Sequence, residues 1–164
     1  MADNIDFSLV GIDSLVGKLE AISYDMKRKG GRTALRKAAQ VVEAKLKENA
    51  ERVDDPDSKE KIADNVAIRW SGRTFKATGD LMFRVGILGG AGSKSKASAY
   101  DGLPGGDTRH WRLLEFGTEH MAAKPFMRKA LADNVSEATN TFITEYEKAI
   151  DRAIKRAAKA AGSS

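Results

Sequence analysis

The last third of the chain carries the longest apolar repeat in the sequence, and this repeat constrains the fold most. Apolar side chains recur every three or four residues from Met127 to Ile154, a spacing typical of one face of a helix. An unbroken helix over residues 125–161 would run about 55 Å, which exceeds the width of a domain of this size. Part of this face therefore needs a partner, either a helix at residues 33–52 or another subunit. A bend is expected at residues 133–134.

Shorter patterns precede this repeat. Alternating apolar and polar residues predict a strand at residues 5–9, and a helix is expected from residue 13 until Gly30-Gly31 breaks it. Thr33 is expected to open a second helix, which ends before an acidic loop that contains Pro56. The apolar stripe of this second helix consists of Leu35, Ala38, Val42, Leu46 and Ala50.

The period of the pattern changes after the acidic loop. Val66, Ile68 and Trp70 alternate with other residues, as do the apolar residues of 81–87, and a polar connection of hairpin type lies between them at 71–79. We therefore expect two antiparallel strands. The predicted fold class is α+β, a small antiparallel sheet packed with two N-terminal helices and a long C-terminal helix, in a single domain over residues 1–164.

Residues 89–108 form a stretch rich in Gly, Ser and Lys. A structureless segment of roughly 20 residues is unusual inside a compact domain. Two alternatives stay open, namely an arm that becomes ordered against a partner, or a flexible loop. Candidate contacts to subunits or partners lie in this segment and on the C-terminal helix: Lys94, Lys96, Tyr100, Phe142, Tyr146 and Ile150.

No set of residues for catalysis or cofactor binding emerges from the sequence. The chain has no cysteine, no GxSxG motif, and two histidines, His110 and His120, that stand too far apart for a helical metal-binding pair. The glycines of residues 86–92 lack the following amphipathic helix that a phosphate-binding loop requires. We expect no enzyme, no cofactor and no metal. No apolar run is long enough to span a membrane, and no signal peptide is expected.

The chain is basic, with a formal net charge of +5. A dense group of cations without an intervening acid comprises Lys27, Arg28, Lys29, Arg32, Arg36 and Lys37. Positive charges at the start of a helix interact unfavourably with the helix dipole. A bound nucleic acid or acidic protein would neutralise this charge. The simpler interpretation is a solvated helix face. No helix-turn-helix, zinc finger or RNA-binding motif accompanies them. A small basic nucleic-acid-binding protein is therefore the alternative function.

The most informative motif lies between Trp111 and Leu131. Gly117 permits a backbone angle that is barred to other residues, and Pro125 suits the first turn of the helix that follows. Glu115 is expected to pair with Arg128 or to accept the N-terminal amides of that helix, which would pin the turn to the helix. The apolar residues Leu113, Leu114 and Phe116 are expected to pack on the sheet.

The motif combines an aromatic residue, two variable positions and Leu-Glu-Phe-Gly-Thr with a later Ala-x-Pro-Phe-x-x-x-Ala-Leu. It resembles the neck or tail-completion proteins of long-tailed phages, the gene-product-ten-like minor tail proteins of lambdoid siphophages. The opening Leu-Val-Gly-Ile-Asp-Ser-Leu is also similar. The residues that carry the motif and are expected to act as scaffold are Trp111, Leu114, Glu115, Phe116, Gly117, Thr118, Pro125, Phe126 and Leu131.

The resemblance implies a structural virion protein of the neck or tail, assembled in the bacterial host cytoplasm and without a catalytic role. It implies a ring of six copies at the junction between head and tail. The implied partners are other copies of the chain, the phage connector or head-closure proteins, and the tail-terminator or tail-tube proteins. Non-specific contact with passing DNA is compatible with the basic charge, and no contact with a membrane is expected.

Overall fold

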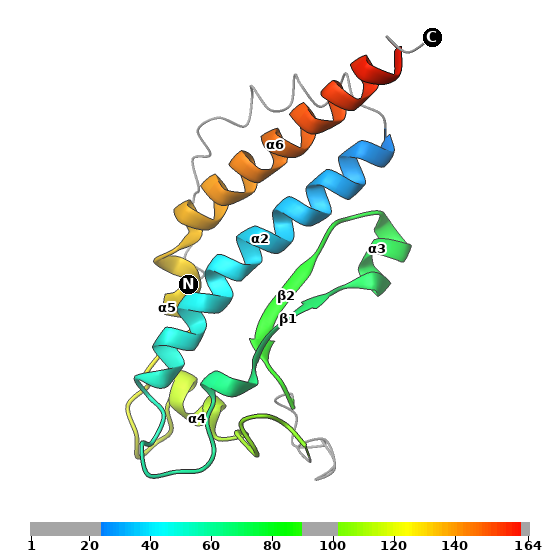
Figure 1. The fold of residues 1–164 in the computed structure, drawn as a ribbon. Coiled ribbons are helices and arrows are strands. Elements are labelled where there is room, and N and C mark those ends of the chain that lie inside the picture. Colours follow the sequence, from blue (N-terminus) through cyan, green and yellow to red (C-terminus); the bar gives the residue numbers. More distant parts are fainter. Residues whose placement is uncertain (1–23, 90–101, 162–164) are drawn as a thin grey trace.

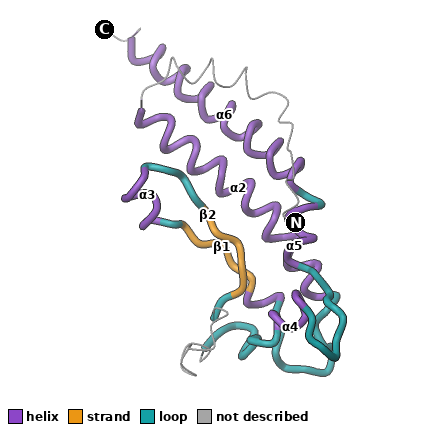
Figure 2. The backbone as a smooth tube through the Cα atoms, turned by 180° about the vertical axis from the view of Figure 1, so that it is seen from behind, coloured by secondary structure: helices purple, strands orange, loops and turns teal. Residues whose placement is uncertain are grey.

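The computed structural model describes residues 24–89 and 102–161, and these form an elongated arrangement of helices beside one hairpin. Helix α2 (Tyr24–Glu51) lies in the middle, with α6 (Val135–Ala161) along one side and the strands β1 (Val66–Trp70) and β2 (Phe83–Ile87) along the other (Figures 1 and 2). The predicted α+β class is confirmed. The strand expected at residues 5–9 lies outside the described residues.

Helix α2 passes through Gly30 and Gly31, so the predicted break at this pair is wrong. The reason is tertiary packing. A Cβ atom on Gly30 would lie 3.1 Å from the Tyr146 ring and 3.2 Å from the Cβ atom of Ala149, and one on Gly31 would lie 2.9 Å from a methyl carbon of Leu81. Because the glycines have no side chain, α6 and Leu81 can approach the backbone of α2 closely at these two positions. The gain in packing outweighs the poor helix propensity of glycine.

The predicted start of a helix at Thr33 is also wrong, because the helix is continuous through the glycine pair and Thr33 lies inside α2. The Thr33 hydroxyl donates a hydrogen bond to the Lys29 carbonyl at 3.1 Å, one turn earlier in the same helix. The predicted apolar stripe is confirmed at its centre and end, where Ala38, Leu46 and Ala50 are buried. The acidic loop does follow the helix. Within it, the carboxylate of Asp54 accepts hydrogen bonds from the backbone N–H groups of Ile62 at 2.9 Å and Ala63 at 3.2 Å, which ties the loop to the 3-10 turn Ala63–Asn65.

The two predicted strands pair in antiparallel fashion, with Val66 opposite Ile87 and Trp70 opposite Phe83. Their connection is not purely a polar turn, because it contains the short helix α3 (Gly72–Thr78). Helix α3 ends at Gly79, whose φ of 80° lies in the left-handed region that favours glycine. The inner face of the hairpin contributes to the core beside α2, which also holds residues far apart in the sequence: Leu46, Ala50, Ile62, Ala63, Val66, Phe126 and Ala130.

The long C-terminal repeat is divided into α5 (Met127–Ala132) and α6, so the bend predicted at residues 133–134 is confirmed. The side-chain amide of Asn134 donates to the Ala130 carbonyl at 2.9 Å and closes the end of α5. Pro125 does not lie in the first helical turn as expected but precedes the N-cap residue Phe126. Helix α6 has 27 residues, or about 40 Å, and its apolar face packs on α2, the first of the two partners considered above.

Within residues 24–89 and 102–161, none of the helices combines the length and apolar character that a membrane crossing requires.

Candidate interaction site at the α4–α5 corner

The motif at residues 111–131 folds into a corner between two short helices, α4 (Trp111–Phe116) and α5, at the end of the molecule where α2 terminates (Figure 1). We call residues 111–131 the α4–α5 corner. The Trp111 and Leu114 side chains pack against the core that includes Phe126 and Ala130. The corner is therefore built onto the core and does not project as a free loop.

A buried carboxylate holds the corner together. Glu115 is 1% exposed, and its Oε2 atom accepts hydrogen bonds from the backbone N–H groups of Phe126 at 2.8 Å and Met127 at 2.9 Å. Its Oε1 atom accepts from the N–H of Arg128 at 3.1 Å and from the guanidinium Nε of Arg128 at 3.0 Å. Both roles predicted for Glu115 are thus confirmed, because it pairs with Arg128 and caps α5 simultaneously. The arrangement satisfies a buried charge completely.

The backbone turn between the two helices depends on Gly117. Its φ is 75°, and a Cβ atom there would lie 2.8 Å from the Ala123 nitrogen and 2.8 Å from the Met121 carbonyl oxygen. Thr118 and Met121 form a single β-bridge, and the Lys124 N–H donates to the Leu114 carbonyl at 2.7 Å. The requirement for glycine here is therefore both conformational and steric, as the sequence predicted.

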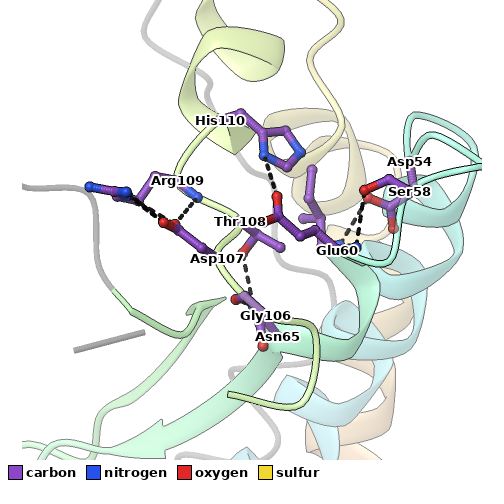
Figure 3. A network of polar contacts seen from close by, with 10 residues as sticks. Asp54, Ser58, Glu60, Asn65, Gly106, Asp107, Thr108, Arg109 and His110 are labelled. Atoms are coloured by element: carbon purple, nitrogen blue, oxygen red, sulfur yellow. Dashed lines mark hydrogen bonds and ion pairs between the residues drawn. The ribbon is translucent and has the colours of Figure 1, made fainter. Parts of the chain in front are cut away.

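A second polar cluster anchors the segment that leads into the corner (Figure 3). Asn65 is fully buried, and its amide donates to the Gly106 carbonyl at 2.9 Å and to the Thr108 hydroxyl at 2.8 Å. Its carbonyl oxygen accepts from the Gly105 N–H at 2.9 Å. The described end of the predicted loop, residues 102–108, is thus ordered against its own chain. The role of Asn65 is not visible in the sequence, because a single asparagine before a strand gives no local signal for a contact about 40 positions away.

The outer face of the corner is apolar and exposed, which corrects one prediction. Leu113 and Phe116 do not pack on the sheet, since they are 51% and 62% exposed, and Leu131 on α5 is 53% exposed. Their neighbour Leu114 does turn inward. The Arg128 guanidinium, held by Glu115, lies 5.2 Å from the centre of the Phe116 ring. The motif residues, all predicted to act as scaffold, therefore divide between scaffold and surface.

The group of cations at residues 27–37 is partly used within the fold. The guanidinium of Arg28 lies 4.2 Å from the centre of the Phe75 ring, and that of Arg32 lies 4.3 Å from the centre of the Trp70 ring. Lys37 forms an ion pair with Glu145 of α6 at 2.5 Å. These contacts attach the hairpin tip and α6 to α2, so this group is only in part available to a partner. Lys29 and Arg36 are exposed on α2, and the Lys27 side chain lies outside the description.

The predicted partner contacts on the C-terminal helix are mostly internal. Tyr146 and Ile150 are 6% and 4% exposed and pack against Ala34 of α2, with Phe142 partly buried beside them. Burial raises the pKa of the Tyr146 hydroxyl. In this conformation Tyr146 and Ile150 support the helix pair and do not offer a surface to another chain. Lys94, Lys96 and Tyr100 lie outside the described residues.

The two histidines lie on the surface. The Nδ1 atom of His110 is 3.9 Å from a carboxylate oxygen of Glu60 (Figure 3), and the His120 N–H donates to the Thr118 hydroxyl. No group of three or more potential metal ligands gathers anywhere in the part of the chain that the structure describes.

The described residues thus form a helical pair with a small hairpin and an exposed apolar corner on a rigid support. The comparison with known families shows the class of protein. Residues 13–117 match the family described as "Bacteriophage HK97-gp10, putative tail-component". The chain therefore belongs to this family of structural phage tail components. The match includes α2, the hairpin and α4 with Glu115, and it ends at Gly117. No curated protein and no solved structure matches the chain.

Proposed function

We propose that the protein forms a ring at the head–tail junction of a long-tailed phage, where it serves tail completion or head–tail joining. The observation that carries this proposal is the exposed apolar face of the α4–α5 corner. Leu113 and Phe116, three residues apart on α4, and Leu131 on α5 are each more than half exposed. Large apolar side chains that are exposed on one face of a helix mark contact sites. The membership in a phage tail family supports a partner inside the virion.

The support beneath this face is as important as the face itself. An interface gains affinity when its contact residues are held in the bound geometry beforehand. Here the Glu115 carboxylate locks α4 onto α5, and Arg128 is held by the same carboxylate beside Phe116. A ring requires that this face meet a different surface on the next copy, which is a heterologous contact. The number of six copies, and the connector and tail proteins as further neighbours, follow from the resemblance described above.

The mass of the purified chain in solution tests the ring, alone and mixed with the connector and tail proteins of the same phage. We expect a closed oligomer, and we expect the double change Leu113→Ser with Phe116→Ser to raise its dissociation constant at least about tenfold, or roughly 1.4 kcal/mol. Ile154→Ser is the control, because the Ile154 side chain is 55% exposed and belongs to the C-terminal half of α6, the end of this helix that lies far from α4 in Figure 1.

Two outcomes would contradict the proposal. A wild-type chain that stays monomeric in all mixtures and enters no particle would exclude the ring. An Ile154→Ser chain that dissociates as readily as the corner variant would show that the corner is not the contact surface. Particles assembled without the protein give an independent test, since we expect heads and tails that remain unjoined or tails that remain incomplete.

The alternative function, nucleic-acid binding through residues 27–37, loses part of its support. Arg28, Arg32 and Lys37 each have a partner within the fold. Their charge therefore serves packing between elements, which the sequence alone could not reveal.

A further inference from the structure

We propose that the outer face of the β1–β2 hairpin binds the phosphate backbone of duplex DNA without sequence preference. This face contains a hollow with a volume of about 490 Å³ between the strands and the start of α3. Arg69, Arg73 and Arg84 line it, and none of its lining residues is acidic. The proposal is independent of the ring and of the α4–α5 corner.

The strand register concentrates the charge. Arg69 of β1 lies directly opposite Arg84 of β2, so the two side chains emerge side by side on the same face of the hairpin. Arg73, near the start of α3, adds a third guanidinium beside them. All three residues are exposed. Among the described residues, none of the three guanidinium groups has an ion pair or hydrogen bond within the chain. Like charges directly opposite in a hairpin are unfavourable, and an anion between them would offset that cost.

The chemistry of the hollow suits a phosphate. Each guanidinium presents a planar set of donors that matches two phosphate oxygens at once. The outer face next to the arginine pair carries little bulk, since Ala67 lies opposite Gly86 two positions along the strands. A Cβ atom on Gly86 would meet no heavy atom within 4 Å, so the space above this strand is open. A phosphate group can therefore approach the strands closely while the three side chains surround it.

Duplex DNA fits this face better than a single strand does. Single-stranded nucleic acid requires free aromatic faces on which bases stack. The Trp70 ring already packs against Phe75 and Phe83, with ring centres 5.4 Å and 5.1 Å away, and the Arg32 guanidinium covers it. An acidic protein segment is also less suited, because interfaces between proteins are built around exposed apolar or aromatic anchors. Of the residues that line this hollow, only the three arginines are exposed. Contact to backbone phosphates alone carries no sequence information.

Titration of a fluorescent mixed-sequence duplex with the full chain tests the proposal, at several salt concentrations. The site variant is R69Q/R73Q/R84Q. The control variant is K59Q/K124Q/K129Q, which removes the same number of charges from exposed positions outside the hollow. We expect wild-type binding at low salt and at least a tenfold loss in the site variant. Since the three arginines surround one phosphate, and each neutralised phosphate contributes about 0.9 to the slope of log K against log salt, this slope should fall by about 0.9 in the site variant. The control should lose less than a third as much affinity.

A second variant separates binding from folding. Arg84→Glu turns the opposed like charges into an opposed ion pair, so it should raise the melting temperature of the protein while it abolishes DNA binding. A variant that merely unfolds would lower both. The proposal fails if the wild-type chain does not bind the duplex at low salt, or if site and control variants lose affinity equally. It also fails if a single strand binds as tightly as the duplex, or if polyglutamate binds the hollow more tightly than the duplex and displaces it.

Discussion

The α4–α5 corner and the pair of long helices α2 and α6 are held together in opposite ways. The helix pair relies on small and apolar residues, with Gly30 and Ala34 of α2 against Tyr146 and Ile150 of α6. The corner relies on one buried carboxylate that accepts four hydrogen bonds from α5. Apolar contacts are non-directional and tolerate small shifts, whereas a buried charge is stable only when every donor is in place.

The difference relates to what each region presents to solvent. The helix pair turns its apolar face inward and leaves a charged surface, so it needs no unique geometry beyond close packing. The corner turns Phe116 and Leu113 outward, and a contact surface of this kind functions only when its position is defined. We infer that directional polar bonds are placed where the protein meets its partners, and non-directional packing where it only needs to be stiff.

Removal of the buried carboxylate should give the largest effect. Glu115→Ala leaves three backbone N–H groups at the start of α5 and the Nε atom of Arg128 without their acceptor, while Nη2 of Arg128 keeps its hydrogen bond to the backbone carbonyl of residue 115. A buried N–H group that loses its acceptor costs about 1–3 kcal/mol, so the loss of the acceptor of three such groups should lower the free energy of unfolding in urea by at least about 3 kcal/mol. Arg128 adds little, because its side chain is 61% exposed and water solvates it. Glu119→Ala is the control, because this carboxylate in the same corner is exposed, and it should change the stability by less than about 0.5 kcal/mol. Equal effects of the two changes would mean that the carboxylate is not what holds the corner.

Overpacking of the helix pair should give an intermediate effect. Gly30→Leu introduces a side chain where a Cβ atom alone would already lie 3.1 Å from the Tyr146 ring, and overpacking of this kind costs about 1–3 kcal/mol. The sign of the change in unfolding free energy distinguishes the two effects. In an isolated helix, leucine in place of glycine is stabilising by about 0.8 kcal/mol or more, so a net loss of stability indicates overpacking. Ala44→Leu, at an exposed position of α2, provides the control and should be close to neutral. A stabilised Gly30→Leu protein would refute close approach of the two helices at this glycine.

The sequence predicted those features that rest on local chemistry. The strands followed from alternation, the bend at residues 133–134 from a pair of poor helix formers, and the Glu115 cap from a carboxylate placed before a helix start. Each of these signals acts over a few residues. The glycine in the corner was predictable for the same reason, because a tight turn between two short helices demands a positive φ.

The features that the sequence did not reveal depend on distant neighbours. Gly30 and Gly31 predict a helix break when read alone, and only the approach of α6 and Leu81 turns them into contact positions. The exposure of Phe116 could not be derived from the sequence, because Leu113, Leu114 and Phe116 form one short apolar group and only the tertiary packing separates the buried from the exposed members. Arg69 and Arg84 become neighbours only through the register of the hairpin. Tertiary packing overrides local propensity at these positions.

The smallest effect is expected at the ion pair that joins the two long helices. The hydrogen bond from Lys37 to Glu145, and a second from Lys148, hold the pKa of the Glu145 carboxyl below its ordinary value of 4.5. A carboxyl whose pKa is lower in the folded state adds stability above the unfolded pKa, and this stability is lost as the pH falls through the folded pKa. Lys37→Gln should therefore lower the melting temperature slightly at neutral pH and have no effect in acid below that range.

Lys45→Gln is the matched control for this pair, since Lys45 is also on α2 but pairs with Glu48 of the same helix. Its effect should be no larger than that of Lys37→Gln, and both should shrink at high salt because exposed charges are screened. A deficit of the Lys37→Gln protein that persisted in acid would mean that the side chain stabilises the helix pair through the packing of its methylene groups. The contrast between the two regions would then become sharper, because the contact between α2 and α6 would depend on packing even at its ion pair.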